Sequence, residues 1–368
     1  MTLEPQLWTA EVVYAGFGTP MLEGGLAIVG EHVAAVGALK DLQTQFPTAP
    51  VVHKGRALTP PTVNAHTHLD LSTLPYYQGP YTGFIRHVIA NGAQRGAGAA
   101  KVGLEELLAN RTGAYGDIAA RDEAMEVLLE TSPLPGVAYR EVLGADPTKA
   151  DEIFGTMMPK LRAWKRQEGR VKVGISPHTA HTVSAPLLQK LCEAAQAEGF
   201  PVQIHIAESP EETAYFRDNS GPMAAFMAPF NPAWQGHGVS PVQHLAKLGV
   251  LSANLTLVHA VQVDDNDVQT LAQAGCRVIS CPRSNQGLEC GPLPWGLYAK
   301  HQVEVALGTD SRGSAPDLDV RNEALFLWEK VDKRVLVRAA TRSGYRALGL
   351  ECPRITRGSP ASSVESWG

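Results

Sequence analysis

The chain has 368 residues, of which 44% are hydrophobic and 19% are charged, and its formal net charge is −5. This length can bury a large core, either in one large domain or in one domain with a small companion. The composition contains no basic block and no basic amphipathic stretch, which argues against binding to nucleic acid or to a membrane surface. We therefore expect a soluble enzyme that acts on a small molecule.

The N-terminal sequence MTLEPQLWTAEVV does not have a basic region followed by an apolar one, so it does not predict a signal peptide. No apolar run is long enough to span a bilayer. The five cysteines are odd in number and scattered, which does not fit a disulfide framework and predicts a reducing, cytoplasmic location. Cys281 and Cys290 flank an expected site loop, but without a C-x-x-C pair we favour buried small hydrophobic residues over zinc thiolates.

Residues 1–57 contain short apolar stretches that are punctuated by glycine, as in EVVYAGFGTP and GGLAIVGEHVAAVG. This pattern predicts a small β domain, the first half of a β-sandwich. The last segment, residues 351–368, is expected to return to that domain or to be disordered. Because its sequence RITRGSPASSVESWG is short, we expect the second half of the sandwich to be short or absent.

Over residues 58–350, strand-length apolar runs alternate with helical patterns, several of which end in glycine. The expected strands lie at residues 57–66, 113–119, 136–144, 171–178, 201–208, 254–261, 276–282 and 303–310. Eight strands that alternate with helices predict an α/β fold, the (β/α)₈ TIM barrel. A doubly wound open sheet is the alternative, and it is disfavoured because no G-x-G-x-x-G follows the first strand of the series.

Residues 217–240 interrupt this alternation with a segment rich in Gly, Pro, Met and aromatic residues. The segment is too long and too apolar for a plain connector. We interpret it as a lid or as part of a pocket wall, and a packed surface loop is an equally good interpretation.

Histidine and acidic residues stand at the ends of the predicted strands. They are His66 and His68 on the first, His178 and His181 on the fourth, His205 and Glu208 on the fifth, His259 on the sixth and Asp310 on the eighth. The carboxyl ends of all barrel strands point to one mouth, so these side chains are expected to converge there. Positions i and i+2 of a strand share a face, so His66 and His68 can present two nitrogens to one metal ion.

Neutral imidazoles with one carboxylate suit Zn²⁺, and also Fe²⁺ or Mn²⁺. We expect a single ion that lowers the pKa of a bound water towards about 7. Its expected ligands are His66, His68, His205 and Asp310. Each residue alone also has a simpler interpretation: His259 as a buried, hydrogen-bonded histidine, Asp310 as a helix N-cap, and Glu208 as a charge at a helix start. The order of the set along the strands favours the metal site.

The motifs VNAHTHLDLS, SPHTAHTVS, IHIAES, LVHA, CPRSN and LGTDS, in this order, resemble the amidohydrolase superfamily and its single-metal deaminase branch. The resemblance covers nearly the whole chain. It implies one zinc or iron ion on the four ligands, Glu208 as the proton shuttle, His259 as a hydrogen-bond partner of the attacking water, and His178 as a substrate contact. It also implies a homodimer. No lysine ends the fourth strand, which argues against the two-metal branch with a carboxylated lysine.

Within this branch, NAHTHLDLS followed by GFIRHVI is similar to the aminodeoxyfutalosine deaminases of the alternative menaquinone pathway. The chain has Asp70 where that subgroup is expected to have Glu, and His87 where Trp is expected. The implied substrate carries an adenine ring and a benzoate, and its carboxylate is expected to bind an arginine. The candidates for substrate binding are, in this order, Arg283, Arg86 and Arg140, together with Glu141.

Other functions remain open at this point. Deamination of another nucleoside or base and hydrolysis of an amide, an imidazolone ring or a C–Cl bond use the same metal chemistry. Glu208 favours deamination, because an amidine nitrogen must be protonated before it leaves. A metal-binding barrel without catalysis is disfavoured, since the expected ligands, Glu208 and His259 are all present.

Overall fold

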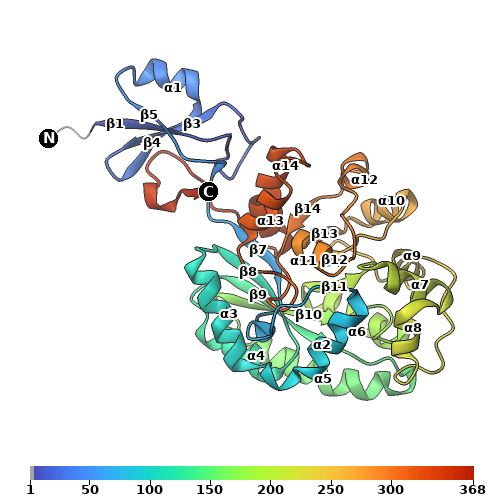
Figure 1. Ribbon diagram of the computed structural model, residues 1–368. Helices are drawn as coiled ribbons and strands as arrows, with labels where there is room; N and C mark the ends of the chain where they lie inside the picture. The colour runs from blue at the N-terminus through green and yellow to red at the C-terminus, as the bar shows by residue number, and fades with distance from the viewer. Residues whose placement is uncertain (1–3) are drawn as a thin grey trace.

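The computed structural model describes residues 4–368, which form a small β domain beside a large barrel (Figure 1). The small domain contains a sheet of four strands in the order β4-β3-β1-β5. Its strands are β1 (Pro5–Thr9), β3 (Gly24–Val29), β4 (His32–Ala38) and β5 (Val51–His53), and α1 (Leu39–Gln45) packs against the first three. The expected N-terminal β structure is therefore present.

The large sheet has eight strands in sequential order, and all its neighbouring strands are parallel. They are β7 (Val63–Thr67), β8 (Ala114–Ala119), β9 (Gly136–Val142), β10 (Val171–Pro177), β11 (Val202–Ile206), β12 (Leu255–His259), β13 (Arg277–Ser280) and β14 (Val305–Leu307). A bridge from Thr67 to Asp310 joins the first strand to the end of the last. The predicted TIM barrel is confirmed, and all eight strands lie within or next to their expected ranges.

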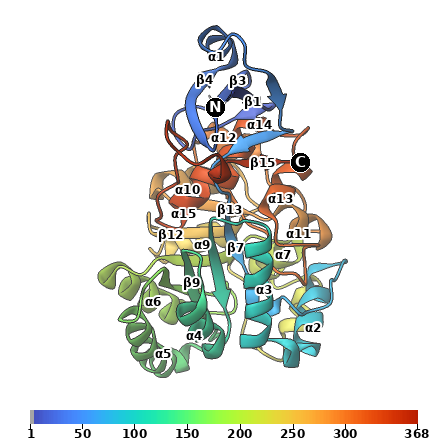
Figure 2. The same cartoon turned by 90° about the vertical axis from the view of Figure 1, so that its left-hand side faces the viewer.

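Helices surround this sheet on its outer side (Figure 2). The helical patterns that the sequence shows between the strands form α3 (Ala97–Ala109), α4 (Asp122–Thr131), α5 (Ala150–Lys165), α6 (Ala185–Glu198) and α10 (Asp265–Ala274). Local signals explain their ends: Asp264 caps α10 in a capping box, and Gly199 and Gly275 end α6 and α10 in the left-handed conformation.

Further helices complete the layer and the mouth of the barrel. They are α2 (Tyr81–Ala90), α7 (Pro210–Asp218), α8 (Gly221–Met227), α9 (Pro241–Lys247), α11 (Pro282–Gly287), α12 (Trp295–Lys300), α13 (Val320–Phe326), α14 (Lys333–Arg338) and α15 (Gly344–Ala347). The Met- and Phe-rich segment, residues 217–240, contains α8, and the residues after this helix form turns and irregular structure. Within residues 4–368, we find no helix with the length and hydropathy needed to traverse a lipid bilayer.

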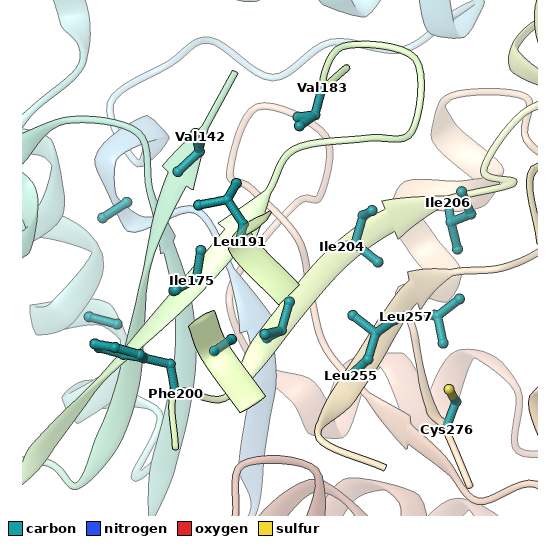
Figure 3. Packing of buried hydrophobic residues seen from close by; sticks show 14 of the residues in the cluster. Val142, Ile175, Val183, Leu191, Phe200, Ile204, Ile206, Leu255, Leu257 and Cys276 are labelled. Carbon is teal, nitrogen blue, oxygen red and sulfur yellow. The ribbon is translucent and has the colours of Figure 1, made fainter. Parts of the chain in front are cut away.

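The main core lies between the strands and the outer helices (Figure 3). Ile175, Ile204 and Leu257 on neighbouring strands contribute to one layer with Leu191 of α6 and Phe200, and all five side chains are almost completely buried. Burying each such side chain contributes about 1.5–3 kcal/mol. This packing holds the strands, and hence their carboxyl ends, in fixed positions.

The C-terminal residues return to the N-terminal part of the chain. Strand β15 (Glu365–Trp367) pairs antiparallel with β6 (Ala57–Thr59), which pairs in parallel with β2 (Val12–Val13). The Trp367 side chain is fully buried, and its Nε1 donates to Thr59 Oγ1 at 3.0 Å. The second small sheet is therefore short but present, and the C-terminal segment links the small domain to the barrel.

Candidate active site

Three histidines and an aspartate meet at the carboxyl ends of β7, β11 and β14. The Nε2 atoms of His68 and His205 are 3.2 Å apart, and Asp310 Oδ1 lies 3.5 Å from His68 Nε2 and 3.7 Å from His66 Nε2. Four ligands about 2.1 Å from one tetrahedral ion would lie about 3.4 Å from each other. These side chains come from three strands that lie far apart in the sequence, and their spacing is that expected for ligands of one metal ion.

The chemistry of these donors also fits a metal. His66 Nε2 is buried and has no hydrogen-bond partner among the described residues, a costly state that an ion would relieve. Burial lowers the pKa of His68 and of His205 well below the ordinary value. Both imidazoles are therefore neutral, which is the form that binds a metal.

Further polar groups fix the orientation of the ligands. Gln203 Oε1 accepts from His66 Nδ1 at 3.1 Å, and the carbonyl oxygen of His178 accepts from His205 Nδ1 at 3.1 Å, which leaves both Nε2 atoms unprotonated. Ser284 and Ser314 donate to Asp310 Oδ2 at 2.7 and 2.8 Å, and Oδ1 is left to face the histidines. Removal of such a supporting hydrogen bond typically weakens metal affinity by about 10- to 100-fold.

Glu208 and His259 lie beside this cluster. The Glu208 Oε1 atom is 3.6 Å from His259 Nε2, and together with Asp310 the two residues form a second group whose ligand atoms lie within 4.8 Å of one another. Burial raises the pKa of Glu208 well above its ordinary value, and the charge of Asp310 adds to this effect. Glu208 is therefore suited to carry a proton at neutral pH and to act as a general acid.

The backbone at the strand ends is strained where the site is built. Ala207, His259 and Asp310 have φ angles of 49°, 67° and 64°, in the left-handed region that non-glycine residues seldom adopt. Glu212 supports this conformation, because its carboxylate accepts from the backbone N–H groups of Ala207 at 3.2 Å and Glu208 at 2.6 Å. Strain of this kind is commonly retained at functional sites, where the surrounding structure holds it in place.

A cavity of about 540 Å³ opens above the cluster. Its floor contains His68, His205, Glu208, His259 and Asp310, and its side includes His178 and Glu141. One wall is apolar and comes from α2 and from α8 with the residues that follow it. This wall consists of Tyr81, Phe84, Ile85, Val88, Ile89, Phe226, Met227 and Phe230. The Met- and Phe-rich segment therefore does contribute to a pocket wall.

Residues 57–364 match the Amidohydrolase family. The chain belongs to the amidohydrolase family. The chain is 42% identical to the aminodeoxyfutalosine deaminase of Deinococcus radiodurans, over 98% of this chain and 88% of that protein. It is 27% identical to the 5-methylthioadenosine/S-adenosylhomocysteine deaminase of Nitratidesulfovibrio vulgaris strain DP4, over 94% of this chain and 79% of that protein.

Solved structures show the same fold. The aminofutalosine deaminase of Helicobacter pylori, crystallised with methylthio-coformycin, superposes with a TM-score of 0.74 and 20% identity, over 97% of this chain and 90% of that one. An adenosine deaminase from Xanthomonas campestris with bound zinc gives a TM-score of 0.69 and 24% identity, over 97% and 83% of the two chains. At this level of identity these likenesses establish the arrangement of the barrel.

The structure places the arginines that the sequence suggested for substrate binding outside the cavity lining of this amidohydrolase. Arg283 forms ion pairs with Asp317 and Glu323, both at 2.7 Å. The physical reason is its position on α11: Ser284 and Asn285 face the site, and successive helical residues are rotated by about 100°, so Arg283 points away. Arg86 lies 4.9 Å from the Phe226 ring. Arg140 pairs with Asp122 at 2.9 Å.

Several residues at the site were not predicted. Asn285 Oδ1 accepts from His259 Nδ1 at 2.7 Å and so fixes that ring. Asn285 lies within the motif CPRSN, which offered a signal, whereas Gln203 and Ser314 carry no recognisable pattern. Arg95 and Arg121 line the cavity from loops that follow α2 and β8, and nothing in the sequence distinguished them from surface arginines.

Proposed function

We propose that this amidohydrolase is a metal-dependent deaminase that replaces an amino group on an amidine-type carbon of a purine-like nucleoside by oxygen and releases ammonia. The observation that carries this proposal is the convergence of the ligands His66, His68, His205 and Asp310 with a buried Glu208 in one cavity. A hydrolase that only needed to polarise a carbonyl group would not need a proton donor beside the ring nitrogen. The protonated Glu208 meets that need.

A divalent ion bound by the four ligands would supply Lewis-acid activation of a water molecule. Asp310, ionised and aligned by two serines, accepts a proton from the attacking water. Glu208 donates a proton to the ring nitrogen of the amidine as the carbon–oxygen bond forms. His259, whose Nδ1–H is donated to Asn285, presents an unprotonated Nε2 that accepts a hydrogen bond from the water and orients it. Asp310 then gives its proton to the amino group, the carbon–nitrogen bond breaks and ammonia leaves. The hydroxyl proton returns to Glu208 as the carbonyl forms, so that water and amidine yield amide and ammonia.

The substrate that we propose is aminodeoxyfutalosine. The relative at 42% identity supports it, because the alignment covers nearly the whole of both chains. Zn²⁺ is the proposed metal, with Fe²⁺ suited to the same ligands, and a bound zinc in a structural neighbour supports this choice. The five unpaired cysteines support a reducing, cytoplasmic location.

Substitution of Glu208 tests the proposed chemistry. The Glu208→Gln variant should keep its metal content and lose about 10²- to 10⁴-fold in turnover, because an amide cannot donate the required proton. Ammonia release from aminodeoxyfutalosine and elemental analysis of the purified protein measure the two properties. The exposed Glu193 on α6 provides a matched control, and Glu193→Gln should leave both unchanged. A Glu208→Gln protein with wild-type turnover would refute the assigned role.

A further inference from the structure

The cavity lining includes two guanidinium groups, and only one of them has its charge matched by a close partner. Arg95 Nη2 lies 3.1 Å from a carboxylate oxygen of Asp70, which is completely buried. The two opposite charges of that pair offset each other. The glutamate of the side wall, Glu141, lies 3.9 Å from His178 Nε2. Arg121 is the lining cation that these contacts leave available.

Arg121 retains free hydrogen-bond donors. Its Nη2 donates to the carbonyl oxygen of Gly92 at 2.6 Å, which holds the side chain in place. The nearest carboxylate, Glu123 Oε1, is 3.7 Å from Nη1, beyond hydrogen-bond distance, and both side chains are about half exposed. A guanidinium has five N–H groups in a fixed fork. Arg121 is therefore anchored at one nitrogen and can present its other donors to a planar anion.

The position of Arg121 in the barrel fits recognition of a part of the substrate that does not react. Arg121 follows β8, which lies four strands from β12 in the eight-stranded order and so on the opposite side of the barrel from His259. The same cavity has the apolar wall of α2 and α8, where the exposed Ile89 and Phe230 lie at the rim. A molecule that fills this space presents its amidine to Glu208, an apolar body to the wall and an anionic group to Arg121.

We propose that Arg121 is the specificity-determining residue of this site and binds a carboxylate at the end of the substrate remote from the amidine. This inference rests on the proposed function, since it assumes that the amidine lies at Glu208. A carboxylate matches the planar fork of a single guanidinium in a bidentate pair. The proposal replaces the arginines suggested by the sequence, which the structure places outside the lining.

Kinetics with matched probes test this proposal. The probes are aminodeoxyfutalosine, its neutral methyl ester and the neutral nucleoside 5′-methylthioadenosine, each with the metal-replete enzyme. Arg121→Gln should raise KM for the carboxylate about 10- to 100-fold, the loss expected for a charge-assisted hydrogen-bonded pair, and should change kcat little. For the ester and for 5′-methylthioadenosine, the KM and kcat of Arg121→Gln should stay within about twofold of the wild-type values. Arg121→Lys should raise KM for the carboxylate by an intermediate amount, because lysine keeps the positive charge but cannot form the bidentate pair.

Arg86→Gln is the matched control, because Arg86 is a cation of α2 that packs on the Phe226 ring but does not itself line the cavity. It should leave KM for the carboxylate within about twofold of the wild type. An unchanged KM in Arg121→Gln, or an equal loss on the carboxylate and the ester, overturns the role of Arg121 and leaves the deaminase intact. A wild-type enzyme that releases no ammonia from any of the three probes overturns the proposed function itself.

Discussion

At the scale of single residues, the site depends on side chains that never contact the reacting atoms. Asp310 presents Oδ1 to His66 and His68 because Ser284 and Ser314 hold its other oxygen. A buried carboxylate without these donors would lose hydrogen bonds that favour its charged form. The two serines therefore favour the ionised form of Asp310 and hold its Oδ1 atom toward the histidines.

Ser284→Ala should weaken metal binding by about 10- to 100-fold, because it removes one of the two donors that orient Asp310. Titration of the metal-free protein with Zn²⁺ against a competing chelator measures the effect. Ser280→Ala is a suitable control, since Ser280 is equally buried but its hydroxyl has no hydrogen-bond partner among the described residues. Equal metal affinity in the Ser284→Ala and Ser280→Ala proteins would contradict the role given to Ser284.

At the scale of elements, strands and their ends were predictable from sequence, and the orientation of short helices was not. Each barrel strand is a short apolar run bounded by turn residues, and its carboxyl end must reach the common mouth. The positions of His66, His205 and Asp310 followed from that rule. Helix α11 has six residues and no clear apolar face, so which of its side chains would face the site depended on tertiary packing. For this reason Arg283 was predicted to bind the substrate, whereas the structure turns Ser284 and Asn285 toward the site and pairs Arg283 with Asp317 and Glu323.

The contact between β7 and the end of β14 leaves no room for a side chain at Gly308. A Cβ atom there would lie 2.7 Å from His66 Cβ and 2.8 Å from the His66 backbone nitrogen and oxygen. Gly308→Ala should therefore destabilise the protein by about 1–3 kcal/mol and reduce metal affinity, because His66 must move. Urea denaturation and zinc titration measure the two effects.

Gly296 offers the matched control for this substitution. It lies in α12, and a Cβ atom added there would meet no heavy atom within 4 Å. Gly296→Ala should leave metal affinity unchanged and stabilise the protein by about 0.5–1 kcal/mol, since alanine loses less backbone entropy on folding. If Gly308→Ala behaved in the same way, the two strands would not be as closely apposed as the structure shows.

At the scale of the whole molecule, the C-terminal segment joins the two domains. Trp367 packs in one cluster with Val12 and Tyr14 from the N-terminal part and with Trp328 from the helical layer. Glu365 lies in the same strand, is buried, and accepts from the Thr62 backbone N–H at 3.2 Å just before β7. The sequence left open whether this segment would return, because its three-residue strand is too short to produce a recognisable pattern.

Burial raises the pKa of Glu365 to about 7 from an ordinary value of 4.5, against the opposing charges of Arg321 and Arg111. The folded protein thus binds this proton more tightly than the unfolded chain does. The stabilisation is fully present below pH 4.5 and is lost as the pH rises through about 7. Glu365→Gln cannot titrate, so between pH 5.5 and pH 8 its stability should rise relative to the wild type by roughly 1–3 kcal/mol.

Urea midpoints of the metal-loaded proteins at the two pH values measure this difference. Glu351→Gln is the control, because Glu351 is exposed in the same C-terminal region, and its stability should follow that of the wild type at both pH values. A Glu365→Gln protein whose stability ran parallel to the wild type would show that the buried carboxylate does not titrate in this range.

The bridge from Thr67 to Asp310 has a consequence for the order in which the barrel folds and its metal site is completed. The seam where the cylinder closes is also the place where the ion would sit, with ligands from the first strand on one side and from the last on the other. A growing polypeptide on the ribosome carries His66 and His68 long before Asp310 is synthesised. The complete coordination sphere can therefore form only after the eighth strand has emerged, so the full set of four ligands requires a closed barrel.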